Sequence, residues 1–60
     1  MKQLALHDLE AVYDSLAEAV TAAGADKEAL FLTKLVLLLA NASGDRAQVE
    51  QAIAEALRNL

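Results

Sequence analysis

Apolar residues recur along the chain with helical spacing, and two glycines divide this pattern into three segments. Gly24 and Gly44 each follow an apolar segment, in the C′ position where glycine adopts φ > 0 without steric cost. Asp26 and Asp45 come next, and aspartate is a good N-cap residue. Gln48, three residues after Asp45, completes the pattern of a capping box. The sequence therefore predicts three helices, at about residues 8–23, 27–42 and 46–59.

The two outer segments are amphipathic. On the first, apolar residues fall within an arc of about 100°, and Glu10, Asp14 and Glu18 lie on the opposite side. The apolar residues of this arc are Leu9, Val12, Tyr13, Leu16, Val20 and Ala23. The third segment repeats this arrangement, with alanines that permit close helix approach. Because short connections favour antiparallel neighbours, we expect an all-α fold: one three-helix antiparallel domain spanning residues 1–60.

The middle segment differs because it is apolar around most of its circumference. Only Lys27, Lys34 and Asn41, spaced by seven, form a continuous polar strip. Two neighbouring helices cannot cover such a surface, so a second chain is expected to complete the core, giving a homodimeric helical bundle. The strip should face solvent and the dimer seam should lie away from it. The predicted interface residues are Phe31, Leu32, Leu35, Val36, Leu38 and Leu39.

The size and charge of the chain exclude several classes of binding site and partner. A chain of sixty residues is near the lower limit for an independent core, and the absence of cysteine excludes disulfides and thiolate metal sites. The net charge of −4 disfavours nucleic acid and anionic lipid as partners. The most apolar stretch is interrupted by Thr33 and Lys34 and is too short for a membrane span. The N-terminus lacks the pattern of a signal peptide, so a cytoplasmic location is expected.

Candidate catalytic and ligand-binding groups are few. His7 and Glu10 have i, i+3 spacing, but without a second histidine they are better interpreted as a helix cap and its capping-box partner. The tripeptide Asp14-Ser15-Leu16 matches the phosphopantetheine site of acyl carrier proteins, although there the serine opens a helix. Lys34 has no second polar group to make it a nucleophile, and its stem is expected to lie over neighbouring leucines. We therefore predict no catalytic residue, no metal site, no cofactor and no enzymatic activity.

Two longer stretches resemble a known family. They are Leu9-Glu10-Ala11-Val12-Tyr13-Asp14-Ser15-Leu16-Ala17 and Phe31-Leu32-Thr33-Lys34-Leu35-Val36-Leu37-Leu38-Leu39-Ala40-Asn41, followed by Gly44-Asp45. Together they are similar to a family of short bacterial all-helical proteins known only as a domain of unknown function. The family pattern has a serine at the first helix cap, where this chain has His7. The resemblance implies a bacterial accessory protein that serves a metabolic enzyme such as a flavoprotein oxygenase, and it brings no catalytic residues.

Three functions remain open. The first is a non-catalytic interaction module, a small accessory or regulatory subunit whose acidic face of Glu10, Asp14 and Glu18 docks on a larger metabolic enzyme. The second is a small-ligand or acyl carrier protein that uses an apolar helical pocket. The third is an acidic, antitoxin-like inhibitor.

Overall fold

The computed structural model describes residues 3–58 and 60 and is all-helical there. Its helices are α1 (Leu6–Ala23), α2 (Glu28–Ser43) and α3 (Arg46–Arg58). The predicted all-α, three-helix fold is confirmed, with boundaries within two residues of those expected. The predicted last residue of the third helix, Asn59, lies outside the described residues. Across the described part of the chain, no helix is both long enough and apolar enough to cross a membrane.

Both glycines end helices as predicted. The Gly24 N–H donates to the Val20 carbonyl at 3.2 Å, and the Gly44 N–H donates to the Ala40 carbonyl at 3.0 Å. Gly44 has φ 70° and ψ 12°, in the left-handed region, and Gly24 has φ 84° and ψ 158°. Both conformations are unfavourable for residues with a Cβ atom. These two glycines therefore fix where the chain turns.

The predicted helix caps have different outcomes. The Gln48 N–H donates to the Asp45 carboxylate at 3.2 Å, so Asp45 caps α3 as expected. The prediction for His7 was wrong: α1 begins one residue before it, after Ala5, which makes no side-chain capping bond. Asp26 was also predicted wrongly, because the Lys27 N–H bonds to the Gly24 carbonyl and this turn moves the cap position to Lys27.

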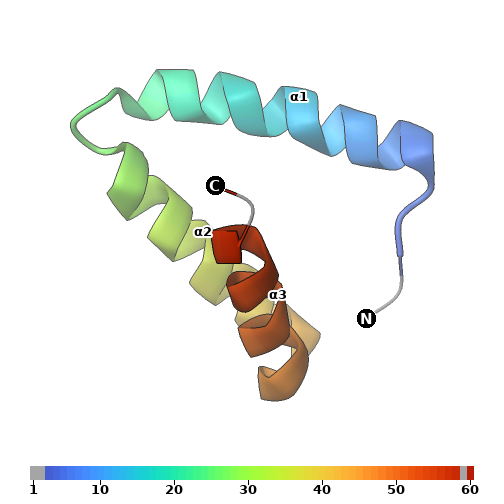
Figure 1. Ribbon diagram of the computed structural model, residues 1–60. Helices are drawn as coiled ribbons and strands as arrows, with labels where there is room; N and C mark the ends of the chain where they lie inside the picture. The colour runs from blue at the N-terminus through green and yellow to red at the C-terminus, as the bar shows by residue number, and fades with distance from the viewer. Residues whose placement is uncertain (1–2, 59) are drawn as a thin grey trace.

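The helices form an open arrangement around α2. Figure 1 shows α3 folding back along α2, whereas α1 and α2 diverge from the Gly24 turn like the arms of a V. α2 contacts both other helices, and within the described residues α1 and α3 do not contact each other. Side chains that are partly covered on α1 all lie in its C-terminal half: Leu16, Ala19, Val20 and Ala23. Among residues 3–58, the N-terminal half of α1 therefore projects without a neighbour from another helix.

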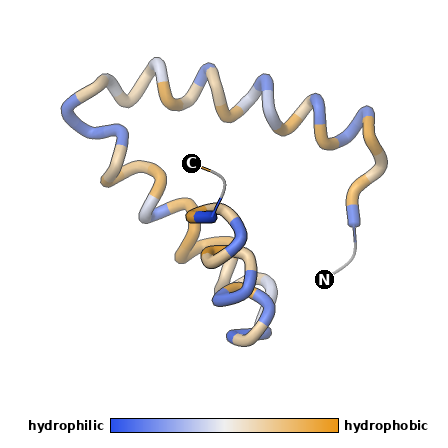
Figure 2. The backbone as a smooth tube through the Cα atoms, viewed as in Figure 1, coloured by the Kyte–Doolittle hydropathy of each residue, from blue (hydrophilic) through white to orange (hydrophobic). Residues whose placement is uncertain are grey.

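Little of the apolar surface is covered in the single chain. None of the described residues is fully buried, and Figure 2 shows hydrophobic positions along all three helices. The radius of gyration is 12.5 Å, compared with about 10 Å for a compact chain of this length. The accessible surface is 5440 Å², compared with about 3,800 Å² for a compact monomer of this mass. The cover that α1 and α3 give to α2 is thus smaller than the sequence led us to expect.

Candidate interaction surfaces

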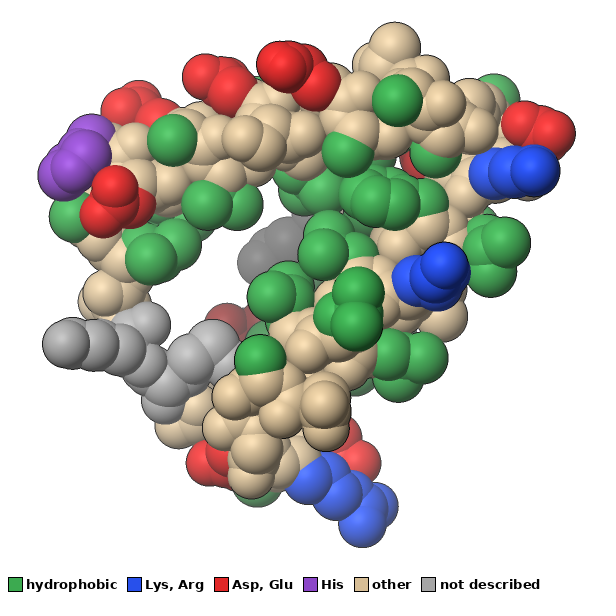
Figure 3. All heavy atoms as spheres, turned by 180° about the vertical axis from the view of Figure 1, so that it is seen from behind, with side chains coloured by type: hydrophobic (Ala, Val, Ile, Leu, Met, Phe, Trp, Pro, Cys, Tyr) green, Lys and Arg blue, Asp and Glu red, His purple; other side chains and the backbone are tan. Residues whose placement is uncertain are grey.

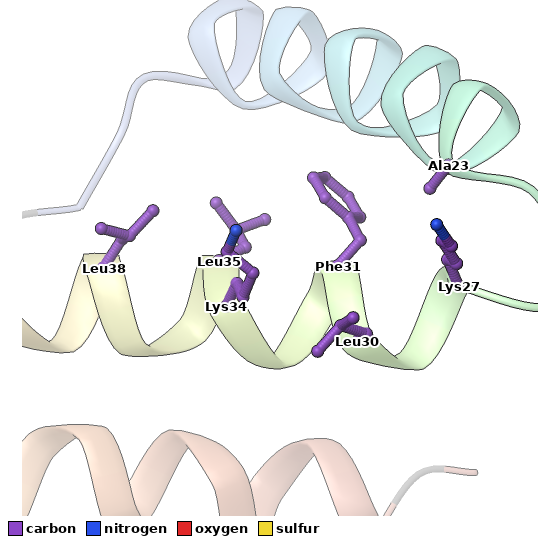
Figure 4. A pocket seen from close by; sticks show the side chains of 7 residues that line it. All are labelled: Ala23, Lys27, Leu30, Phe31, Lys34, Leu35 and Leu38. Carbon is purple, nitrogen blue, oxygen red and sulfur yellow. The ribbon is translucent and has the colours of Figure 1, made fainter.

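An apolar groove lies between α1 and α2, on the inner side of the V. Hydrophobic side chains gather here, and acidic side chains stand on the outer side of α1 (Figure 3). The groove has a volume of about 390 Å³. Phe31, Leu35 and Leu38 point from α2 toward α1 in Figure 4, and Ala23 faces them near the turn. The complete lining is Ala23, Lys27, Leu30, Phe31, Lys34, Leu35 and Leu38.

Two lysines border this groove. Lys27 and Lys34 are among its lining residues, so the polar strip of α2 adjoins the apolar groove and does not lie away from it. The exposed fraction of Leu38 is 67%, while Phe31 and Leu35 are half-buried. The groove thus has a half-covered apolar floor, an open end at Leu38 and positive charges on its rim.

A second apolar groove, of about 490 Å³, lies between α2 and α3. Val36 and Leu39 contribute from α2, and Val49 and Ile53 contribute from the apolar stripe of α3. The remaining lining residues are Ala40, Ala42, Ser43 and Ala52. This groove has small side chains on both helices and no charged residue in its lining. It is therefore chemically distinct from the lysine-bordered groove between α1 and α2.

The six predicted interface residues line three different hollows of the single chain. Three of them, Phe31, Leu35 and Leu38, line the groove between α1 and α2. Val36 and Leu39 line the groove between α2 and α3. Leu32 and Val36 also line a shallow hollow with Thr33 and Leu37. The Thr33 hydroxyl donates to the Ala29 carbonyl at 2.8 Å, so the threonine adds no free donor to this hollow.

The sequence interpretation gave no interface role to the apolar residues in the N-terminal half of α1. Leu6, Leu9, Val12 and Tyr13 have exposed fractions of 72%, 54%, 51% and 72%. They continue the stripe whose C-terminal part meets α2. The amphipathic pattern revealed this stripe, but it could not show that α2 reaches only half of it.

The predicted acidic face is exposed on α1. By the helical repeat, Glu10, Asp14 and Glu18 lie away from the centre of the apolar stripe, and all three residues are exposed. Within residues 3–58 none of them forms an ion pair. This face is therefore a separate charged surface, on the opposite side of α1 from the groove.

The remaining candidate groups stay apart from one another. His7 lies 3.4 Å from the Asp8 carboxylate, with both side chains exposed. Among the described residues, no group of three metal-binding side chains comes together. Ser15 lies in the middle of α1, exposed, and not at the start of a helix as in acyl carrier proteins. Tyr13, which belongs to the apolar arc of the first segment, is also exposed.

Comparison with known proteins identifies a family. No curated protein matches the chain, and no solved structure matches it. A family whose description is "Protein of unknown function (DUF2783)" matches residues 1–58. This match spans all three helices and both glycine turns. The chain therefore belongs to the DUF2783 family of proteins of unknown function.

Proposed function

We propose that this protein is a non-catalytic interaction module, a homodimer that serves as a small accessory or regulatory subunit of a bacterial metabolic enzyme. One observation carries the proposal: the single chain leaves its apolar helix faces exposed. The exposed fraction of Leu38 is 67%, that of Leu39 is 60%, and that of Ile53 is 52%. A chain that keeps such residues in water forfeits the main stabilising contribution to folding.

The size of the uncovered surface supports a second copy as the cover. The accessible surface of 5440 Å² exceeds that of a compact monomer by about 1,600 Å². Obligate dimers bury about 1,000 to 2,500 Å² on each partner, whereas weaker complexes bury about 800 Å². Covering the excess on two chains therefore requires an interface of the obligate class.

The outer face of α1 supports the accessory role. By the helical repeat, Asp14 and Glu18 lie on the side of α1 away from the apolar stripe, so they remain available when the stripe is covered. A row of unpaired carboxylates attracts a basic patch and steers its approach. The larger partner would thus present lysine or arginine side chains. We place the complex in the bacterial cytoplasm, with the cysteine-free sequence as support.

Sedimentation equilibrium and thermal unfolding at several concentrations test the proposal. A dimer should be observed, and the midpoint of thermal unfolding should rise with protein concentration, because mass action stabilises the folded dimer. A compact monomer at high micromolar concentration, with a concentration-independent midpoint, would refute self-association.

Native mass spectrometry of the protein purified from its own host tests the accessory role. A stoichiometric complex with an enzyme supports it, and the charge reversals Asp14→Lys and Glu18→Lys should weaken that complex. The reversal Arg58→Glu, on a different helix, is the control. A covalent adduct on Ser15 would instead establish the carrier function and overturn the proposal.

A further inference from the structure

The groove between α1 and α2 widens away from the Gly24 turn. Its floor runs along α2 from Lys27 to Leu38, a length of about 16 Å at 1.5 Å per residue. α1 closes the groove only near the Gly24 turn, because the two helices diverge beyond it. An occupant must therefore be a short apolar element that enters from the open side.

The chain itself carries a segment with matching properties. Residues 6–13 of α1 form about two helical turns, roughly 12 Å long, with an exposed apolar stripe. This stripe cannot reach the groove of its own chain, since the two arms of the V diverge. In a second copy the same stripe is free to do so.

Charges at the edges of the two surfaces are complementary. Lys27 and Lys34 border the groove. Asp8 and Glu10 lie on the two flanks of the stripe in residues 6–13, as placed by the helical repeat. When the stripe lies in the groove of another copy, an acidic flank therefore faces the lysines of its rim. Opposite charges in this position favour the docked register and exclude like-charged alternatives.

We infer that residues 6–13 of each copy pack into the groove between α1 and α2 of the other copy, with Asp8 or Glu10 facing Lys27 and Lys34. This inference rests on the proposed self-association and adds which surfaces meet. The exchange is reciprocal, as a two-fold dimer requires, because each chain offers one stripe and one groove. It covers Leu9, Val12 and Tyr13 of one copy with Phe31, Leu35 and Leu38 of the other.

Cross-linking between two single-cysteine variants tests the contact. The chain has no native cysteine, so each variant carries one reactive thiol. Val12→Cys mixed with Leu38→Cys should give a mixed dimer with a short bifunctional maleimide, which avoids the strict geometry of a disulfide. Asp14→Cys mixed with Leu38→Cys is the matched control, because Asp14 lies two residues further along α1 but on its outer side. Equal yields from both pairs would overturn the inference.

Charge reversal gives an independent test that changes no apolar residue. One variant carries Lys27→Glu and Lys34→Glu, and the other carries Asp8→Lys and Glu10→Lys. Each should form its own dimer about ten-fold more weakly than the unchanged protein, since like charges then meet at both grooves. Mixing the two variants should restore association and helical circular dichroism, because opposite charges meet again in the mixed dimer.

The variant with Asp8→Lys and Glu10→Lys distinguishes this specific contact from a general effect of net charge on association. Its two reversals bring the formal net charge from −4 to zero. If net charge alone governed association, this variant would pair with itself more tightly than the unchanged protein does. Tighter self-pairing would therefore overturn the inference.

The outcomes also distinguish the inference from the proposed function. A dimer that cross-links between Leu39→Cys and Ile53→Cys, but not between Val12→Cys and Leu38→Cys, would refute this contact and leave self-association intact. A protein that remains monomeric at all concentrations would refute both.

Discussion

The effect of truncating Leu38 on stability distinguishes a monomer from a dimer that buries this side chain. The exposed fraction of this side chain is 67% in the single chain. In a monomer, Leu38→Ala should change the free energy of unfolding by less than about 0.5 kcal/mol, as at other surface positions. In a dimer that buries the exposed two-thirds, the loss is about 1 to 1.5 kcal/mol for each chain. Because both chains carry the change, the dissociation constant of the dimer should rise about 30- to 150-fold.

The neighbouring residue supplies a matched control for this change. Leu37 has an exposed fraction of 64% on the same helix, but it lines neither the groove between α1 and α2 nor that between α2 and α3. Alanine is a good helix former, so helix propensity does not distinguish the two variants. Sedimentation equilibrium gives both dissociation constants, and urea unfolding at fixed concentration gives both stabilities. Equal, small effects of Leu37→Ala and Leu38→Ala would show that the groove at Leu38 stays open to water.

Three further predictions concern local structure, each measured by urea unfolding at fixed protein concentration. Gly24→Ala should lower the free energy of unfolding by about 2 to 3 kcal/mol, and Gly44→Ala should lower it by about 1 kcal/mol. The difference arises because only Gly24 combines φ 84° with ψ 158° and places a new Cβ 3.3 Å from Asp26 Oδ1. The reverse order of the two losses would contradict this reasoning. Asp45→Ala should cost about 1 kcal/mol through loss of its bond to the Gln48 N–H. Asp26→Ala, at a position without a capping bond, should cost clearly less. Glu50→Ala, which removes the exposed 2.9 Å pair with Arg46, should change stability by less than about 0.5 kcal/mol; a larger loss would indicate a partner for Glu50 beyond this pair.

Local signals in the sequence predicted the elements well, and the errors have identifiable causes. Gly24, Gly44 and Asp45 act through conformations and bonds that involve only a few neighbouring residues, so their roles could be read directly. Asp26 has the same residue type and spacing as Asp45, yet the turn closed by the Lys27 N–H and the Gly24 carbonyl takes up one more residue. α1 begins after Ala5, which has no capping side chain, so no residue type marked that start. Asp8 instead lies in the first turn, where a carboxylate favours the helix dipole.

Surfaces were harder to predict than elements because they depend on angles between helices. The periodicity of α2 showed that its circumference was too apolar for two neighbours, and the exposure of Leu38 and Leu39 agrees with this excess. Periodicity could not show that α1 diverges from α2. Because of this divergence, Lys34 borders a groove and Val12 is left exposed. These relations follow from the backbone of the Gly24 turn. The helical pattern of the two helices does not contain them.

The lack of a fully buried residue in the described part of the chain affects how long an unassembled chain would survive in a cell. Isolated helices shorter than about 15 residues are marginal in water, and α1, α2 and α3 have only 18, 16 and 13 residues. Without cover for α2, their backbone amides would open and exchange with solvent rapidly, and proteases would gain access to the open segments. Chains whose α2 is not covered by another chain would therefore be degraded before assembled chains. The amount of this protein in the cell would follow the amount of its assembled form, with no separate regulator of its abundance.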